Sequence, residues 1–279
     1  MHRIALTVFQ GRAGDHNDLA IPGAKSLGEM LSNRLGLPYQ IIGNPEPALS
    51  AGWKVELEAA LPALRLMAAK FDSILACGLS PLTASSRCAV SLSTLPMVAR
   101  HRPDACVVWF DAHADLNTPD NTTSGYLGGL ALSGPAGLWD SGLGGGLNLS
   151  NMILVGQRDM DPPEQALVDS GQVRWIPPHA NLVFELCEAI AGRPVYVHLD
   201  CDVLDAGIVP TDYRHANGLQ LQELHAACTA LAAGEVVGFE IAEFENAWEE
   251  GGPPVSPAGL LDAVQPLIDR MRHQKERPV

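Results

Sequence analysis

The chain has 279 residues, of which 47% are hydrophobic, and it carries a formal net charge of −14. A chain of this length can bury a substantial core, and one large α/β domain over residues 1–279 fits it better than two small ones. The negative charge argues against nucleic acid or an anionic membrane as a partner, because both require a basic face. The six cysteines lack CxxC spacing, and no signal peptide or long apolar span is recognisable, so we expect a cytoplasmic protein with reduced cysteines.

Strand-like and helix-like segments alternate along the chain. The expected strands are residues 4–9, 39–42, 73–77, 105–110, 152–155, 173–176, 194–199 and 236–241. The expected helices are residues 22–35, 55–70, 81–100, 163–170, 180–191, 221–233 and 257–273. This alternation predicts an α/β fold with helices on both faces of a parallel sheet of about eight strands. In such folds the functional site lies at the carboxyl ends of the strands.

Two of the expected strands end in side chains that bind metal ions. The apolar run 105–110 leads into three such residues on alternate positions, and the run 194–199 ends in a pair with the same spacing. These residues are Asp111, His113, Asp115, Asp200 and Asp202. Alternate residues of a strand point the same way, and buried carboxylates in this number require cations between them to stay ionised. The sequence therefore predicts a carboxylate-rich metal centre.

Three segments resemble the signature segments of the ureohydrolase family, which includes arginase and agmatinase. They are Asp111-Ala112-His113-Ala114-Asp115-Leu116-Asn117, residues 198–205 and residues 238–243. The segments 118–125 and 155–162 resemble substrate-binding loops of arginase, so the resemblance extends over nearly the whole chain. It implies the three-layer αβα arginase/deacetylase-like fold, two Mn²⁺ ions per chain and hydrolysis of a guanidino group.

The resemblance also implies the metal ligands. Asp111 and Asp200 would bridge the two ions, His113 and Asp202 would complete the second metal site, and Asp115 would belong to the first. Carboxylate-rich ligation suits Mn²⁺, and two ions about 3.5 Å apart can share a hydroxide that is nucleophilic at neutral pH. That hydroxide would attack the guanidino carbon.

Further roles follow from the same resemblance. Asp115 would pass a proton to the departing amine, and Glu243 would hold the guanidinium. The α-carboxylate and α-amino group of an amino-acid substrate would be bound by Asn117, Thr122, Ser124 and Asp161.

The chain departs from the family at the first metal site. Where the family has Gly-Gly-Asp-His-Ser after its third strand, the expected third strand here leads into Ala76-Cys77-Gly78-Leu79-Ser80, which lacks the histidine ligand. Cys77 stands two residues before the vacant position, and as a thiolate it could replace the imidazole. The alternative is a buried cysteine that only ends a strand. We include Cys77 among the predicted metal ligands.

A second departure lies in the loop after the first signature segment. The histidine that is thought to shuttle protons in arginase is replaced by Gly128, and a substrate-contacting asparagine is replaced by Tyr126. Both changes argue against plain L-arginine and favour a less basic N-hydroxyguanidine. Within the family the chain is most similar to members that convert Nω-hydroxy-L-arginine into hydroxyurea and L-ornithine in antibiotic biosynthesis, and we predict that reaction.

Other interpretations remain open. The chain could be an arginase/agmatinase-type or formiminoglutamase-type hydrolase, or a silent, metal-poor homologue that acts as a binding protein. His198 is expected to point away from Asp200, and His215 to have a solvated or capping role. The chain ends without the long tail that joins arginase subunits, so we expect a monomer or a weak oligomer.

Overall fold

The computed structural model describes residues 4–274, and residues 1–3 and 275–279 lie outside the description. The chain end on which the expectation about oligomers rests is therefore mostly outside the described part. Among the residues that are described, none of the helices has the length and the apolar content needed to cross a membrane.

A single parallel sheet with eight strands runs through the structure, as predicted. Its strands are β1 (Ile4–Phe9), β2 (Tyr39–Ile42), β3 (Ser80–Ala84), β4 (Cys106–Phe110), β5 (Met152–Val155), β6 (Arg174–Ile176), β7 (Val195–Asp200) and β8 (Val236–Ala242). They lie in the order β2-β1-β3-β8-β7-β4-β5-β6, and every pair is parallel. The carboxyl ends of β3, β8, β7 and β4 therefore meet in the middle of one edge.

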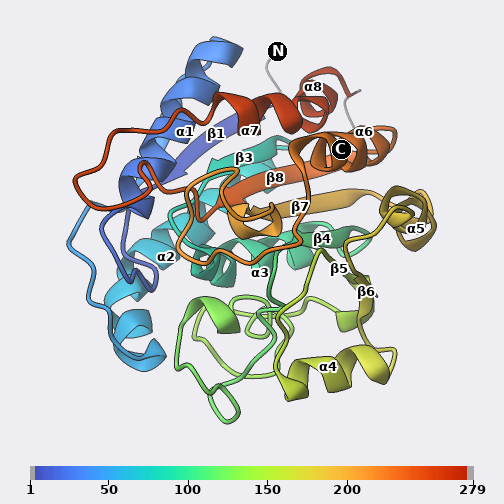
Figure 1. Cartoon of the computed structure of the whole chain (residues 1–279), viewed down its shortest axis with the longest axis horizontal. Coiled ribbons are helices and arrows are strands. Elements are labelled where there is room, and N and C mark those ends of the chain that lie inside the picture. Colours follow the sequence, from blue (N-terminus) through green and yellow to red (C-terminus); the bar gives the residue numbers. More distant parts are fainter. Residues whose placement is uncertain (1–3, 275–279) are drawn as a thin grey trace.

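Helices cover both faces of this sheet (Figure 1). One face carries α1 (Ala20–Leu35), α5 (Leu182–Ile190), α6 (Leu221–Leu231), α7 (Ala258–Ala263) and α8 (Gln265–His273). The other carries α2 (Trp53–Ala76), α3 (Ser91–His101) and α4 (Pro162–Asp169). Along β4, Val108 and Phe110 pack into the first core and Val107 and Trp109 into the second. The strand is apolar throughout because both of its faces are covered, and the three-layer prediction is confirmed.

The expected third strand is the main error of the sequence analysis. Residues 73–76 are the last turn of α2, Cys77 is its C-cap, and β3 begins only at Ser80. The buried positions of α2 recur every three or four residues, and they include Leu57, Ala60, Leu64, Met67, Phe71 and Ile74. The apolar residues near position 74 therefore continue a helix face instead of starting a strand.

The strand β3 was concealed by its composition. It contains a serine, a proline and a threonine, and the region 81–100 was expected to be helical throughout. All five residues of β3 are buried, and the hydroxyl groups of Thr7 and Thr83 are hydrogen-bonded across β1 and β3 at 2.8 Å. A buried partner therefore satisfies a polar side chain in this central strand.

The single helix expected over residues 257–273 is divided into α7 and α8, because Pro266 near the start of α8 cannot continue a preceding helix.

Candidate metal centre and substrate pocket

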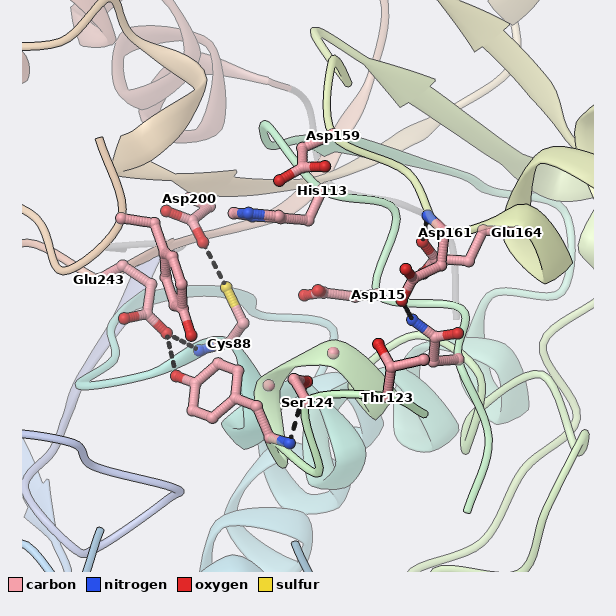
Figure 2. Close-up of a pocket in the computed structure, with 15 residues that line it drawn as sticks. Cys88, His113, Asp115, Thr123, Ser124, Asp159, Asp161, Glu164, Asp200 and Glu243 are labelled. Carbon is pink, nitrogen blue, oxygen red and sulfur yellow. Dashed lines mark hydrogen bonds between the residues drawn. The ribbon is translucent and has the colours of Figure 1, made fainter. Parts of the chain in front are cut away.

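A cavity of about 210 Å³ opens at the carboxyl ends of the central strands. Figure 2 shows Glu243, Cys88 and Asp200 on one side of it, Asp161 and Glu164 on the other, and Asp115 between the two sides. The remaining lining residues include His113, Asn117, Thr123, Ser124, Tyr126, Gly128, Gly129, Asp159 and Tyr213. The cavity thus has acidic side chains on both sides, with Asp115 between them.

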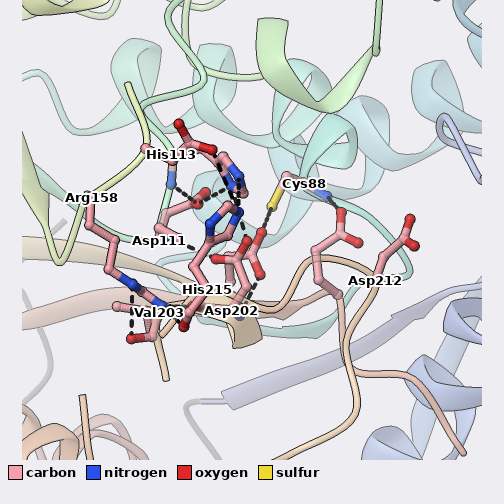
Figure 3. Close-up of polar contacts among 12 residues, drawn as sticks. Cys88, Asp111, His113, Arg158, Asp202, Val203, Asp212 and His215 are labelled. Carbon is pink, nitrogen blue, oxygen red and sulfur yellow. Dashed lines mark hydrogen bonds and ion pairs between the residues drawn. The ribbon is translucent and has the colours of Figure 1, made fainter. Parts of the chain in front are cut away.

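The first part of the site is the β4–β7 ligand group, which comprises Asp111, His113, Asp115, Asp200 and Asp202. Asp111 directly follows β4 and accepts a hydrogen bond from the backbone N–H of His113 at 2.6 Å. Asp200 ends β7 and accepts one from Asp202 N–H at 2.9 Å. Asp202 in turn accepts one from Ala112 N–H at 2.9 Å, which joins the two strand ends. Figure 3 shows the side chains of Asp111, His113 and Asp202 close together, and one ligand-type atom of each lies within 4.8 Å of the others.

Electrostatics in this group favour a bound cation. The Nδ1 of His113 lies 3.0 Å from Asp202 Oδ2 and 3.2 Å from Asp111 Oδ1. Burial alone would lower the pKa of His113, but these two hydrogen bonds raise it well above its usual range. Two buried carboxylates thus converge on one imidazole, an arrangement that a cation would stabilise.

The cost of burying negative charge is visible in the carboxyl groups themselves. Burial, together with the charge of Asp202, raises the pKa of Asp111 to about 6. Burial also raises the pKa of Asp115 and Asp200 well above their usual range. Carboxylates that are hard to ionise alone become stable anions beside a divalent ion. This donor set of carboxylates and one imidazole therefore fits a metal centre.

Two site residues adopt a left-handed backbone that is unusual for side chains other than glycine. Asp115 has a φ of 54° and Glu243 has a φ of 63°. The carbonyl oxygen of Asp115 accepts hydrogen bonds from the N–H groups of Leu132 and Ser133, which hold this conformation. Backbone strain of this kind concentrates at functional sites, where the surrounding structure fixes it.

Cys77, which was predicted as a metal ligand, is not in the site. It is exposed and follows α2, before β3 begins, so it lies at the amino-terminal edge of the parallel sheet. The metal-capable side chains lie at the opposite edge. The prediction is wrong because it rested on a strand at 73–77 that is a helix end.

Cys88 is the thiol that the site does contain. It follows β3, it is buried, and its Sγ lies 3.0 Å from Asp200 Oδ2. When the family's Gly-Gly-Asp-His-Ser is placed after the true third strand, it falls on Ser85-Ser86-Arg87-Cys88-Ala89, with the cysteine at the position of the histidine. Two clusters of ligand-type atoms, each within 4.8 Å, are Cys88, Asp200 and Glu243, and Asp111, His113 and Asp202.

A buried polar chain supports Cys88 from behind. Its Sγ lies 3.2 Å from His198 Nε2, and His198 Nδ1 lies 2.8 Å from Glu240 Oε1. Trp109 stacks on the His198 ring with centroids 3.5 Å apart. The expectation that His198 points away from Asp200 is wrong, because residues two apart on a strand share a face. His198 and Glu240 thus fix the position of the thiol.

Three of the four residues predicted to contact an amino-acid substrate line the cavity, namely Asn117, Ser124 and Asp161. Asn117 Nδ2 donates to Asp161 Oδ2 at 2.8 Å, while the buried Asn117 Oδ1 finds no hydrogen-bond partner among the described residues. Ser124 lines the cavity as predicted, but Thr123 stands where Thr122 was expected. The Thr122 hydroxyl instead accepts a hydrogen bond from Gly125 N–H inside the loop. An unpaired acceptor beside a carboxylate suits an ammonium group.

Glu164 is a further residue that sequence reasoning missed. Its carboxylate accepts hydrogen bonds from Leu116 N–H and Asp161 N–H, each at 2.8 Å, and so closes the capping box at the start of α4. Burial raises its pKa to about 7. The pattern Asp-Pro-Pro-Glu at 161–164 was a usable signal, because an acidic residue three positions after an N-cap is typical of a capping box.

The mouth of the cavity differs from the expectations for two residues. A Cβ atom on Gly128 would lie 2.3 Å from Cε1 of Tyr126, so the tyrosine ring fills the space in which a side chain at 128 would begin. The residues at positions 126 and 128 therefore depend on each other for space.

His215 also differs from its expected solvated or capping role, because its Nε2 lies 3.1 Å from the Nε2 of His113 (Figure 3).

Comparisons with known proteins show the family and the fold of the chain. The arginase family matches residues 29–252. The chain is 39% identical to the N(omega)-hydroxy-L-arginine amidinohydrolase of Streptomyces lavendulae over 95% of this chain and 97% of that protein. It is 29% identical to human mitochondrial arginase-2 over 48% of this chain and 43% of that protein. The arginase structure from Bacillus cereus superposes with a TM-score of 0.80 at 20% identity, covering 99% of this chain and 100% of that one.

Proposed function

The chain belongs to the arginase family, and from this premise we propose that it hydrolyses Nω-hydroxy-L-arginine to hydroxyurea and L-ornithine. The proposal includes one ureohydrolase domain over the whole chain. The observation that carries it is the buried cluster of Cys88, Asp200 and Glu243, in which the cysteine would take the place of a histidine ligand of the family. The likeness to the Streptomyces amidinohydrolase over nearly all of both chains supports the choice of substrate.

Two Mn²⁺ ions are proposed as the cofactor. Cys88, Asp115 and Asp200 would hold one ion, and Asp111, His113 and Asp202 the other, with Asp111 and Asp200 shared between them. The clustering of Cys88 with Asp200 and of Asp111 with His113 and Asp202 supports this assignment, and so does the raised pKa of Asp111, Asp115 and Asp200, since cations would offset the buried charge. Metal ions in such a pair supply a water that is activated as a nucleophile near neutral pH.

The protein's own residues position the substrate and move protons. The α-ammonium group would donate to Asn117 Oδ1 and Asp161, and Ser124 would contact the α-carboxylate. This grip sets the side chain along the cavity, with its guanidino carbon near Asp115 and Glu243. The reaction breaks the bond between that carbon and the ornithine side-chain nitrogen, which must gain a proton to leave as an amine. Asp115 faces the cavity between the two ends and would deliver it.

A silent binding protein and a different ureohydrolase are the competing functions. All five members of the β4–β7 ligand group and Glu243 reach the site, which favours an enzyme over a silent homologue. Agmatine lacks an α-carboxylate, so it would leave Ser124 without its proposed partner, while its ammonium group would still match Asn117 and Asp161. A role in antibiotic biosynthesis, a cytoplasmic location and a monomeric or weakly associated state stay predictions.

Turnover measurements test the proposal directly. Manganese-loaded protein would be given Nω-hydroxy-L-arginine, L-arginine or agmatine, with ornithine or putrescine release followed by mass spectrometry. We expect hydroxyarginine to have the highest kcat/KM, and we expect the chelated protein to be inactive. Faster turnover of agmatine would contradict the substrate assignment. Elemental analysis that finds no bound metal after loading would favour the silent homologue.

A further inference from the structure

Arg87 is a buried cation that the proposed reaction does not use. Its side chain has no exposed surface, and its guanidinium is surrounded by acceptors from three different segments. The Nε donates to Asp15 at 3.1 Å, Nη1 to Glu243 at 2.8 Å, and Nη2 to Asn17 at 3.1 Å. Asp212 lies 3.4 Å from Nη1. An arginine remains charged in proteins, so this is a fixed positive charge behind the wall of the cavity.

The contact with Glu243 limits what this carboxylate can offer a substrate. Its Oε2 accepts from Arg87, while its Oε1 accepts from Cys88 N–H at 2.8 Å and from the Tyr126 hydroxyl at 3.4 Å. A carboxylate has roughly four acceptor positions. Three are in use, which leaves one position on Oε2. A two-pronged guanidinium contact needs both oxygens, so Glu243 can accept only a single further hydrogen bond in this arrangement.

Tyr126 supplies a second polar group at the same place. Its hydroxyl reaches Glu243, and its ring packs against His16 with centroids 4.3 Å apart and against Tyr213 at 5.9 Å. Gly128 leaves the room that this ring position requires. A hydroxyl that donates to Glu243 still has lone pairs, and it can accept a hydrogen bond from another hydroxyl group.

We propose that Arg87 and Tyr126 determine the substrate preference by changing Glu243 from a two-pronged guanidinium clamp into a single acceptor beside a hydroxyl. One N–H of the substrate would donate to Oε2 of Glu243, and the N-hydroxyl group would donate to the Tyr126 hydroxyl. The inference rests on the proposed function and names the residues that select an N-hydroxyguanidine over a guanidine. Arg87 acts through Glu243 and is therefore a positioning residue.

Charge favours the same selection. Two hydrogen bonds that meet at one oxygen place their donors within about 6 Å of each other. A guanidinium on Oε2 would therefore share one negative charge with Arg87, and the two cations would repel each other. An N-hydroxyguanidine is less basic and can bind without a full positive charge. The carboxylates Asp15, Asp212 and Glu245 partly offset Arg87, but none of them lines the cavity.

The test is the ratio of kcat/KM for Nω-hydroxy-L-arginine to that for L-arginine. In Arg87→Met both acceptor positions on Oε2 become free, and we expect the ratio to fall by roughly tenfold or more. In Arg87→Lys a cation is retained, and the ratio should stay within about threefold of wild type. In Tyr126→Phe the partner of the N-hydroxyl group is lost, and the ratio should fall about tenfold.

Arg102→Met is the matched control. Arg102 is an ion-paired arginine that contacts Glu235 and Asp104 beyond the end of α3, away from the cavity, and its loss should leave the ratio unchanged. Arg87→Met leaves several buried carboxylates without a cation, which can prevent folding. The double variant Arg87→Met/Asp15→Asn is therefore made as well, because it removes the charge of one of these carboxylates. Metal content is measured in every variant.

A folded Arg87→Met protein that keeps the wild-type ratio would overturn the inference. If neither Arg87→Met variant folds, the inference is tested by inhibition of the wild-type protein. L-Arginine should inhibit hydroxyarginine turnover with a KI at least about tenfold above the KM for hydroxyarginine. A KI equal to that KM would also overturn it. Absence of hydroxyarginine turnover in metal-loaded wild type would instead contradict the proposed function, so the two failures are distinguishable.

Discussion

The two halves of the site are built in different ways. Within each strand end of the β4–β7 ligand group the contacts are short-range, such as the hydrogen bond from His113 N–H to Asp111, two residues away, and the hydrogen bond from Ala112 N–H to Asp202 joins the two ends. The second half, which we call the β3–β8 group, comprises Arg87, Cys88 and Glu243. It is held by contacts between distant parts of the chain, for example Arg87 to Glu243 across 156 residues. The first half is therefore formed by two strand ends, whereas the second exists only when β3 and β8 pair.

Asp200 connects the two halves, so its loss should have the largest effect. Its Oδ1 accepts from Asp202 N–H and its Oδ2 from the Cys88 thiol. In Asp200→Asn we expect loss of both ions and a fall in kcat/KM of about a thousandfold or more, because a shared anionic ligand is removed. Elemental analysis and turnover measure this. In the absence of metal, Asp200→Asn should be at least as stable as metal-free wild type, because burial raises the pKa of Asp200 and disfavours its charged form. Retention of both ions would show that Asp200 is not shared.

Cys88→Ser should separate the halves. Removal of the thiol takes a ligand from the β3–β8 side only, so we expect one ion to be lost, the other to remain and activity to fall at least about tenfold. Cys77→Ser is the matched control, because that cysteine is exposed at the other edge of the sheet. Two ions per chain in Cys88→Ser, or an equal effect in Cys77→Ser, would rule out Cys88 as the first-site thiol.

The same difference explains which half could be predicted from the sequence. Asp111 and Asp200 follow apolar, β-branched runs directly, so local pattern and alternation were enough to bring their group together. Cys88 could not be placed, because the polar strand β3 resembles a loop and the end of α2 resembles a strand. The contact between Arg87 and Glu243 depends on strand order, which no local pattern encodes. The fold was predictable because it needs only the alternation of elements, not the position of each one.

Glu164 offers a way to sharpen the description of the first half, because it supports the backbone next to Asp115. Its pKa is raised from 4.5 in the unfolded chain to about 7 in the folded one. Because the pKa is raised, the contribution of this carboxyl group to stability is fully present below pH 4.5 and is lost as the pH rises through 7. In metal-free protein, the stability of wild type relative to Glu164→Gln should therefore fall between pH 4.5 and 7 by at most about 3 kcal/mol. Urea unfolding at several pH values measures it.

The control for Glu164 is Glu223→Gln, which makes the same change from carboxyl to amide in the corresponding capping box at the start of α6, in an exposed position. It reports the effect of replacing a capping carboxyl group by an amide without burial. A difference between wild type and Glu164→Gln that does not change with pH would mean that burial of Glu164 has no energetic consequence.

The smallest effect is expected at Gly128, where the second half meets the loop. A Cβ there would lie 2.3 Å from the Tyr126 ring, so Gly128→Ala should destabilise the protein by about 1 to 3 kcal/mol. Gly129→Ala is the control, because a Cβ at that position meets nothing within 4 Å. Combined with Tyr126→Ala, the cost of Gly128→Ala should largely disappear in a double-mutant cycle of unfolding free energies. If Gly128→Ala lowers the free energy of unfolding equally with and without Tyr126, the glycine is not needed to make room for the tyrosine ring. If the two substitutions are strongly coupled, the absence of a side chain at position 128 is what allows Tyr126 to reach Glu243.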